Sequence, residues 1–189
     1  MGGLHRLLAL SALAATAAHA AAAPLPPSPF PPCTADQQTV KDRLLAPLLP
    51  LTPASAASKA KAAASLQASQ LPDGSWVDVN YADKTRGTWA ATVHLSRLKT
   101  MAGAVRAPLS PCVNSSALLA STNKGLSYWV KAKLTNPNWY WNEIGVPQLL
   151  VDIFLLLEGR GLASGDVSTH AQSAPNLIFQ VTSQLDSHV

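Results

Sequence analysis

The spacing of apolar residues predicts helices along most of the chain. Thr34 and Gln37 form the Thr-x-x-Gln pattern of a capping box, and a short helix is expected from there to about Leu45. Prolines then interrupt the chain. Residues 54–70 follow as an Ala-rich segment that favours helix but offers Leu66 as its one large apolar side chain. We therefore expect this second helix to have a weak packing face.

The pattern changes in the middle of the chain and then becomes helical again. Residues 71–83 combine Pro-Asp-Gly turn chemistry with residues that favour extended backbone, so we expect them to be non-helical. From Lys84 the helical spacing returns, and residues 115–134 give a further helix. The apolar residues after Lys84 that lie close to one helical face are Trp89, Val93, Leu98, Met101 and Val105.

The most apolar segment is the run "QLLVDIFLLLEG", residues 148–159. Pro147 suits a first helical turn, because its missing N–H would be unpaired there in any case. A helix that is apolar on nearly every side must be buried on most of them. With a last, shorter helix at 175–185, the sum is about six helices and no alternating strand pattern. The sequence predicts an all-α fold of antiparallel helix pairs, with the helices around Leu98 and Leu155 as its inner layer.

Three consecutive aromatic residues precede that apolar run, in "NWYWNEIG", residues 138–145. Trp139, Tyr140 and Trp141 cannot all enter one core, so some of these rings should face outward. Trp141 is the ring expected to face the core, and Glu143 could cap free N–H groups at the helix start. From the residues alone, core packing and ligand binding both remain open for this cluster.

The first 33 residues indicate export. Residues 1–23 combine a short basic start, an apolar stretch and an Ala-His-Ala end, which together predict a signal peptide; an uncleaved anchor is the alternative. Residues 24–33 are a Pro-rich linker. We expect a secreted, extracellular protein with no membrane segment after cleavage.

An oxidising compartment would permit a disulfide between Cys33 and Cys112, the two cysteines of the chain. Two buried thiols are the alternative. Asn114 begins an Asn-Ser-Ser sequon, which predicts glycosylation on a surface loop, although so short a tripeptide also arises by chance.

Charge and motifs exclude several classes of function. Lys and Arg number 14 against 10 acidic residues, a net charge of +4 that falls to +3 without Arg6, and no basic run indicates nucleic-acid binding. No His or Cys cluster predicts a metal site, and no Gly-x-Ser-x-Gly elbow or phosphate-binding loop occurs. His94 is expected to be a packed or surface imidazole. Asp73 and Asp78 could form a carboxylate pair, with a turn cap at Asp73 as the alternative.

Two segments together resemble a known family. They are "LPDGSWVDVNYADKTRGTWAATVHLSRLKTMAGAV", residues 71–105, and "NWYWNEIGVPQLLVDIFLLL", residues 138–157. Their Asp-Gly-Ser-aromatic and Asn-Trp-aromatic-x-x-Glu-Ile-Gly-x-Pro signatures resemble the N-terminal helical domain of polysaccharide lyase family 8, which includes hyaluronate, chondroitin AC and xanthan lyases.

The resemblance implies an incomplete (α/α) toroid with a long cleft for an acidic, uronic-acid polysaccharide. Asn138, Trp139 and Tyr140 fall on the family's Asn-Trp-Trp sugar platform, with Tyr140 in place of the second Trp. The phenol ring still offers a flat face for stacking against sugar C–H bonds.

The family reaction is β-elimination, in which a base removes the proton at C5 and the bond to the C4 oxygen breaks; no metal or cofactor is implied. In "SAPNLIF", Asn176 loosely matches the family's catalytic Asn, which neutralises the carboxylate; an ordinary first-turn helix Asn is the alternative.

The family's base and acid, its later toroid helices and its C-terminal β-sandwich domains have no counterpart here. We therefore expect residues 34–189 to be the N-terminal part of a truncated lyase toroid, with an apolar flank around Leu155–Leu157 left uncovered. Catalysis by this chain alone is not expected. The alternatives are a non-catalytic carbohydrate-binding or interaction module, or a structural fragment with collapsed rings.

Overall fold

The computed structural model describes residues 34–161. The expected signal peptide (1–23), linker (24–33) and last helix (175–185), together with Cys33 and Asn176, lie outside the described residues, and these expectations stay predictions.

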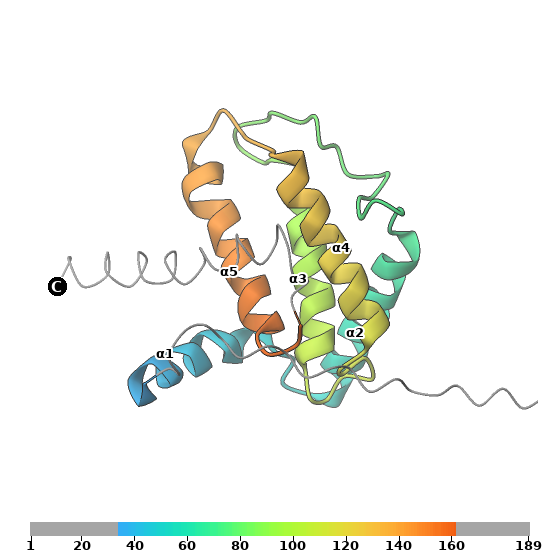
Figure 1. Cartoon of the computed structure of the whole chain (residues 1–189), viewed down its shortest axis with the longest axis vertical. Helices are drawn as coiled ribbons and strands as arrows, with labels where there is room; N and C mark the ends of the chain where they lie inside the picture. Colours follow the sequence, from blue (N-terminus) through green and yellow to red (C-terminus); the bar gives the residue numbers. More distant parts are fainter. Residues whose placement is uncertain (1–33, 162–189) are drawn as a thin grey trace, which may run out of the picture. The chain divides into compact units, whose positions relative to one another are not determined.

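Helices and connecting loops make up the described part of the chain, and no strand occurs within it. The helices are α1 (Ala35–Leu45), α2 (Pro53–Ser69), α3 (Thr92–Arg106), α4 (Ser116–Ala132) and α5 (Val146–Leu157), with a 3₁₀ turn at Ala46–Leu48 and a π-helical turn at Trp141–Gly145. α3 is the central helix and packs against α2, α4 and α5. In Figure 1, α4 and α5 flank it on opposite sides.

The first two helices begin at capping boxes. At α1, the N–H of Gln37 donates to the Thr34 hydroxyl (3.3 Å) while the Thr34 N–H donates to the Gln37 side chain (2.9 Å), as the sequence predicted. α2 begins with the same reciprocal pair between Thr52 and Ser55. Each box satisfies N–H groups that have no partner inside the helix.

The helix expected from Lys84 begins only at Thr92, so that prediction was wrong. Asp83 holds the intervening loop in another conformation. Its carboxylate accepts from the N–H groups of Thr85 (3.2 Å) and Ala90 (2.8 Å), and its carbonyl accepts from the Trp89 indole (2.9 Å). These bonds replace the helical ones, because an Asp side chain competes with the helix for backbone donors.

The core lies around α3. Leu95, Leu98 and Met101 on this helix are fully buried, and α2 meets it with small side chains, which agrees with the weak packing face expected of that helix. The buried alanines of α2 are Ala56, Ala60 and Ala63. Val93 is exposed and does not belong to the core face.

The apolar segment of α5 is covered, contrary to the uncovered flank expected from the sequence. Leu155, Leu156 and Leu157 are all buried. α3 packs along α5, and α1 also packs against it, with an ion pair between Lys41 and Glu158 (2.9 Å). Within the described residues, no helix is both long and apolar enough to cross a membrane.

Candidate functional site

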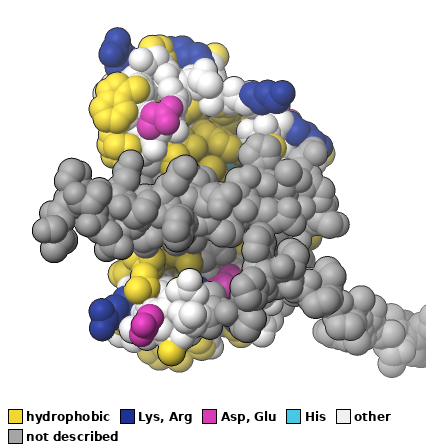
Figure 2. Space-filling model, turned by 60° about the vertical axis from the view of Figure 1, so that its left-hand side comes forward, with side chains coloured by type: hydrophobic (Ala, Val, Ile, Leu, Met, Phe, Trp, Pro, Cys, Tyr) yellow, Lys and Arg dark blue, Asp and Glu magenta, His cyan; other side chains and the backbone are white. Residues whose placement is uncertain are grey.

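The aromatic segment places two of its three rings at the surface. Trp139 is 64% exposed and Tyr140 is 40% exposed, whereas Trp141 packs against the core. The Trp139 and Tyr140 rings meet edge to face, with centroids 6.5 Å apart and planes at 74°. Figure 2 shows hydrophobic side chains beside acidic and basic ones at the end of the bundle where α5 begins. The outward orientation expected for Trp139 and Tyr140 is thus present.

Trp141 anchors this segment to the loop before α3. Its indole N–H donates to the carbonyl of Arg86 (3.1 Å), and its ring lies 6.5 Å from the ring of buried Trp89. Gly145 allows the ring to lie close to the backbone, because a Cβ there would stand 2.7 Å from the Trp141 ring and 3.3 Å from the Tyr140 ring. The partly buried Trp141 ring therefore fixes the start of the helix that carries the two exposed rings.

Asn136 holds the turn that precedes the rings, and it is only 4% exposed. Its side chain accepts from the N–H of Asn138 (2.8 Å) and donates to the carbonyl of Thr85 (3.1 Å). Its backbone exchanges two hydrogen bonds with the Asn142 side chain (2.9 and 2.8 Å). Sequence reasoning missed Asn136; the Asn-Pro-Asn turn at 136–138 was the available signal.

Asn138 has a structural task in this arrangement. Its side-chain oxygen accepts from the N–H of Tyr140 (3.1 Å), which caps the helix start, and its NH₂ group donates to the carbonyl of Arg86 (2.8 Å). The cap considered for Glu143 is absent, and no side-chain cap is made at the π-turn itself. Asn138 therefore positions the neighbouring rings, and it keeps one donor and one acceptor site for a ligand.

A π-helical turn, Trp141–Gly145, joins these rings to α5. The N–H of Val146 donates to the carbonyl of Trp141, five residues earlier, rather than four as in an α-helix. Pro147 follows directly; it lacks an N–H, and its ring would clash with the carbonyl four residues before it in a regular helix. Pro147 was expected in the first turn of the helix. It lies in the first turn of α5, and the π-turn continues the helical chain ahead of it.

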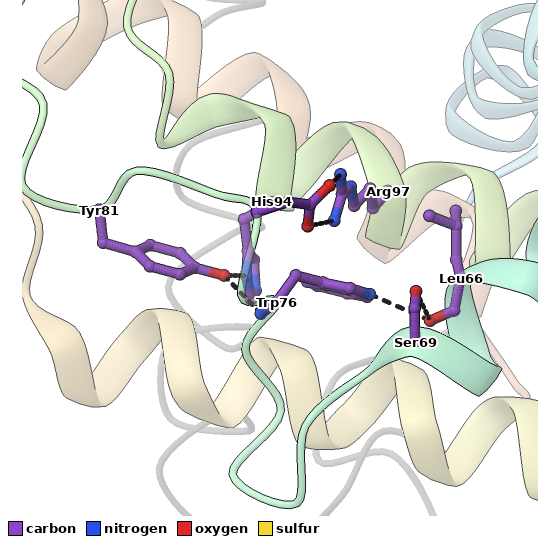
Figure 3. A network of polar contacts seen from close by, with 7 residues as sticks. Leu66, Ser69, Trp76, Tyr81, His94 and Arg97 are labelled. Atoms are coloured by element: carbon purple, nitrogen blue, oxygen red, sulfur yellow. Dashed lines mark hydrogen bonds and ion pairs between the residues drawn. The ribbon is translucent and has the colours of Figure 1, made fainter.

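A polar network connects α2, the loop before α3 and α3 (Figure 3), and a hydrogen bond from His94 extends it to α4. His94 is fully buried, and one ring nitrogen, Nε2, lies 2.9 Å from the carbonyl of Gly125 on α4. Because a carbonyl can only accept, Nε2 carries the proton, and Nδ1 accepts from the Tyr81 hydroxyl (2.9 Å). That hydroxyl in turn accepts from the backbone N–H of Trp76 (3.1 Å).

This network makes His94 a structural group. Burial lowers the pKa of His94 from 6.5 to about 4, so the imidazole is neutral at physiological pH. Both ring nitrogens have partners inside the protein. The sequence left a packed and a surface role open for His94, and the packed role is the one observed. Neither ring nitrogen is free to bind a ligand.

The two carboxylates considered as a pair have separate partners. Asp73 accepts from the N–H (2.9 Å) and hydroxyl (2.7 Å) of Ser75, and these bonds lower the pKa of Asp73. Asp78 forms a bidentate pair with Arg97 (2.7 and 2.6 Å), which lowers the pKa of Asp78, and the Arg97 guanidinium lies over the Trp76 ring. The turn cap is therefore the observed role of Asp73.

The remaining candidates lie away from the exposed rings in sequence. Asn114 is exposed in the turn before α4, with a φ of 58°, and Cys112 is partly buried. Glycosylation at Asn114 and a disulfide from Cys112 to Cys33 stay predictions. Among the described residues, no three His, Cys, Asp or Glu side chains form a group that could hold a metal ion.

Known proteins are similar to this chain in sequence and in fold. Residues 36–175 match the N-terminal alpha-helical domain of polysaccharide lyase family 8. The chondroitinase-AC of Pedobacter heparinus is 33% identical over 86 residues, which are 46% of this chain and 12% of that enzyme. A solved structure of chondroitinase AC lyase, from work on enzyme–oligosaccharide complexes, has a TM-score of 0.62 and 27% identity over 69% of this chain and 19% of its own.

These similarities confirm the fold class predicted from the sequence, an all-α fold that forms part of an (α/α) toroid. The chain spans less than a fifth of either relative's length. It belongs to polysaccharide lyase family 8, as a form of that family's N-terminal alpha-helical domain.

Proposed function

We propose that this domain binds an acidic, uronic-acid polysaccharide across the exposed rings of Trp139 and Tyr140. The observation that carries the proposal is their exposure, 64% and 40%, on a helix start held by Trp141 and Asn136. Large rings left in water cost free energy that a stacked ligand recovers, and a sugar ring presents C–H bonds to an aromatic face. Membership of a lyase family and the similarity to chondroitinase AC support this ligand class.

Two basic residues on the loop that bonds to the aromatic segment fit an acidic ligand. Lys84 and Arg86 are exposed on the loop that bonds to the aromatic segment, and the Arg86 carbonyl accepts from both Asn138 and Trp141. Glu143 is the exposed acid on the same helix start. We infer that an acidic group of the polymer lies toward the loop and away from Glu143.

The binding test is calorimetric titration with chondroitin or hyaluronan oligosaccharides. Trp139→Ala should weaken binding about tenfold or more, because stacking on an exposed ring contributes on the order of 1–2 kcal/mol. Leu51→Ala removes another exposed apolar side chain, outside the aromatic segment, and should leave affinity unchanged. Equal affinity for wild type and the Trp139 variant would refute the platform.

For residues 34–161, one observation favours binding without catalysis. His94 is the one histidine among residues 34–161, and both of its nitrogens are engaged within the fold. The described residues therefore offer no free imidazole to remove the C5 proton. The catalytic role considered for Asn176 concerns a residue outside this range and stays a proposal.

Elimination produces an unsaturated uronate, which absorbs in the ultraviolet. We expect the chain to bind the oligosaccharides without generating this absorbance, while a complete chondroitinase generates it under the same conditions. Absorbance that grows with the chain's concentration and is lost with Trp139→Ala would instead identify a lyase.

We also propose that the protein acts outside the cell, following the signal peptide expected at residues 1–23.

A further inference from the structure

We propose that a second saccharide site lies on α4, in the groove between this helix and the turn at residues 72–74, and that it takes a uronic-acid oligosaccharide. Pro72 and Asp73 form one wall, and Lys124, Ser127, Tyr128 and Lys131 form the other. We call this the α4 groove. Its residues are distinct from those of the aromatic segment, and the inference does not require the site proposed there.

The α4 wall presents a cation, a ring and a second cation in succession. Lys124, Tyr128 and Lys131 are spaced four and three residues apart, which places them on one face of the helix. The two lysines are two helical turns apart, about 10 Å along the axis. A sugar ring stacked on Tyr128 would thus have a positive charge on each side, which fits a polymer whose acidic groups recur on alternate sugars.

The opposite wall is held firmly against α4. Gly74 has a φ of +97°, and a Cβ there would stand 2.4 Å from the carbonyl oxygen of Lys124, so the turn approaches as closely as glycine permits. Gln70 donates both to the carbonyl of Gly74 and to that of Ser121 on α4 (3.1 Å each). The groove is therefore formed before any ligand binds, which lowers the entropic cost of binding.

Tyr128 is fixed from behind by the buried network. Its ring stacks on His94 (5.5 Å between centroids, 29° between planes) and meets Tyr81 at 5.0 Å. Burial raises the pKa of Tyr128, so its hydroxyl keeps its proton and can donate to a sugar oxygen. The ring is partly exposed along the groove.

The charges of the groove are available to a ligand. The three ion pairs found among the described residues use other cations, namely Lys41, Arg97 and Lys99. Lys124 and Lys131 are exposed, whereas one oxygen of Asp73, the acid of the groove, is taken up by Ser75. We expect Asp73 to accept from sugar hydroxyls and the ligand's carboxylates to lie toward the lysines.

The test is calorimetric titration of the full chain with a short chondroitin oligosaccharide at low and high salt. Lys124→Gln with Lys131→Gln should lower the stoichiometry from two oligosaccharides to one, or weaken the groove site about fivefold to tenfold, with a smaller salt dependence. Lys61→Gln, at an exposed lysine on α2, is the matched control and should change nothing. In a Trp139→Ala background, the double lysine variant should abolish the remaining binding.

The outcomes separate the two sites. Binding that Trp139→Ala abolishes and the double lysine variant leaves intact would overturn the α4 groove and leave the platform standing. Binding that the lysine variant alone abolishes would support the groove and refute the platform. A carboxyl-reduced, neutral oligosaccharide that binds the groove as tightly as the acidic one would also overturn the inference. Far-ultraviolet circular dichroism identical to wild type shows that each variant is folded.

Discussion

At the scale of single residues, the placement of the exposed rings depends on the side chains of two asparagines. Asn136 is buried, and its side chain joins the loop at Thr85 to the helix start at Asn138. Asn138 in turn caps Tyr140 and bonds to Arg86. The orientation of Trp139 and Tyr140 is therefore set by amide side chains that bridge two loops far apart in sequence.

Asn136→Ala should destabilise the protein by about 2–4 kcal/mol, because it leaves the Thr85 carbonyl and the Asn138 N–H without partners. Urea unfolding measures this. Asn136→Asp retains the acceptor for Asn138 and should lose less, whereas Gln148→Ala, at an exposed amide on α5, should stay within about 0.5 kcal/mol of wild type. A loss no larger for Asn136→Ala than for Gln148→Ala would remove Asn136 from this role.

The sequence predicted the residues that act locally and missed those that act across the fold. Thr34 caps its helix as expected because the capping box involves only neighbours in the chain. The exposure of Trp139 and Tyr140 followed from the impossibility of burying three consecutive rings. The Thr85 carbonyl that accepts from Asn136 lies on a loop 51 residues away in sequence, and the residues around Asn136 do not predict this contact.

At the scale of elements, local sequence predicted some features of the helix starts, whereas hydrogen bonds in loops and tertiary contacts determined others. The expected start at Lys84 failed because Asp83 captures the N–H groups of Thr85 and Ala90. Pro147 marked a helix start correctly by residue type. The π-turn before it depends on Trp141 packing into the core, a tertiary contact that helical periodicity does not contain.

Gly145→Ala tests that turn. The added Cβ would stand 2.7 Å from the packed Trp141 ring, so we expect a loss of about 1–3 kcal/mol in stability and weaker oligosaccharide binding as the helix start shifts. Gly87→Ala is the matched control, since nothing lies within 4 Å of its Cβ position. Unfolding midpoints and titrations compare the two. Equal behaviour would mean that the π-turn tolerates displacement of Trp141.

At the scale of the whole described fold, His94 connects three parts of the chain. It lies on α3, bonds to Gly125 on α4 and reaches Trp76 in the preceding loop through Tyr81. Gly125 brings α4 close to α3, because a Cβ there would stand 2.5 Å from Leu98. Protonation of this one imidazole therefore affects the packing of α3, α4 and the loop together.

Stability should fall in acid because of His94. Its pKa is about 4 in the folded protein and 6.5 when unfolded, so the unfolded state binds more protons between these values. The stability is complete above pH 6.5 and declines as the pH falls, and the total loss reaches about 3 kcal/mol once pH 4 is passed. Urea unfolding between pH 7.5 and 4 measures it.

His94→Gln should be less stable at neutral pH and should show a smaller loss across this window. Asp78 and Asp83 have lowered pKa values, set mainly by hydrogen bonds from Arg97 and Thr85 respectively, so most of their contribution is lost at the acid end of this window and below it. Parallel pH profiles for wild type and variant would show that another group controls acid stability.

Because the tryptophans differ in burial, intrinsic fluorescence can report on the exposed ring alone. Of its five tryptophans, Trp76, Trp89 and Trp129 are buried and Trp141 is packed against the core, which leaves Trp139 as the fluorophore open to a collisional quencher. Iodide should therefore extinguish one emitting population and spare the rest. A polymer seated on that ring would shield it from iodide, so occupancy can be followed without attaching a dye.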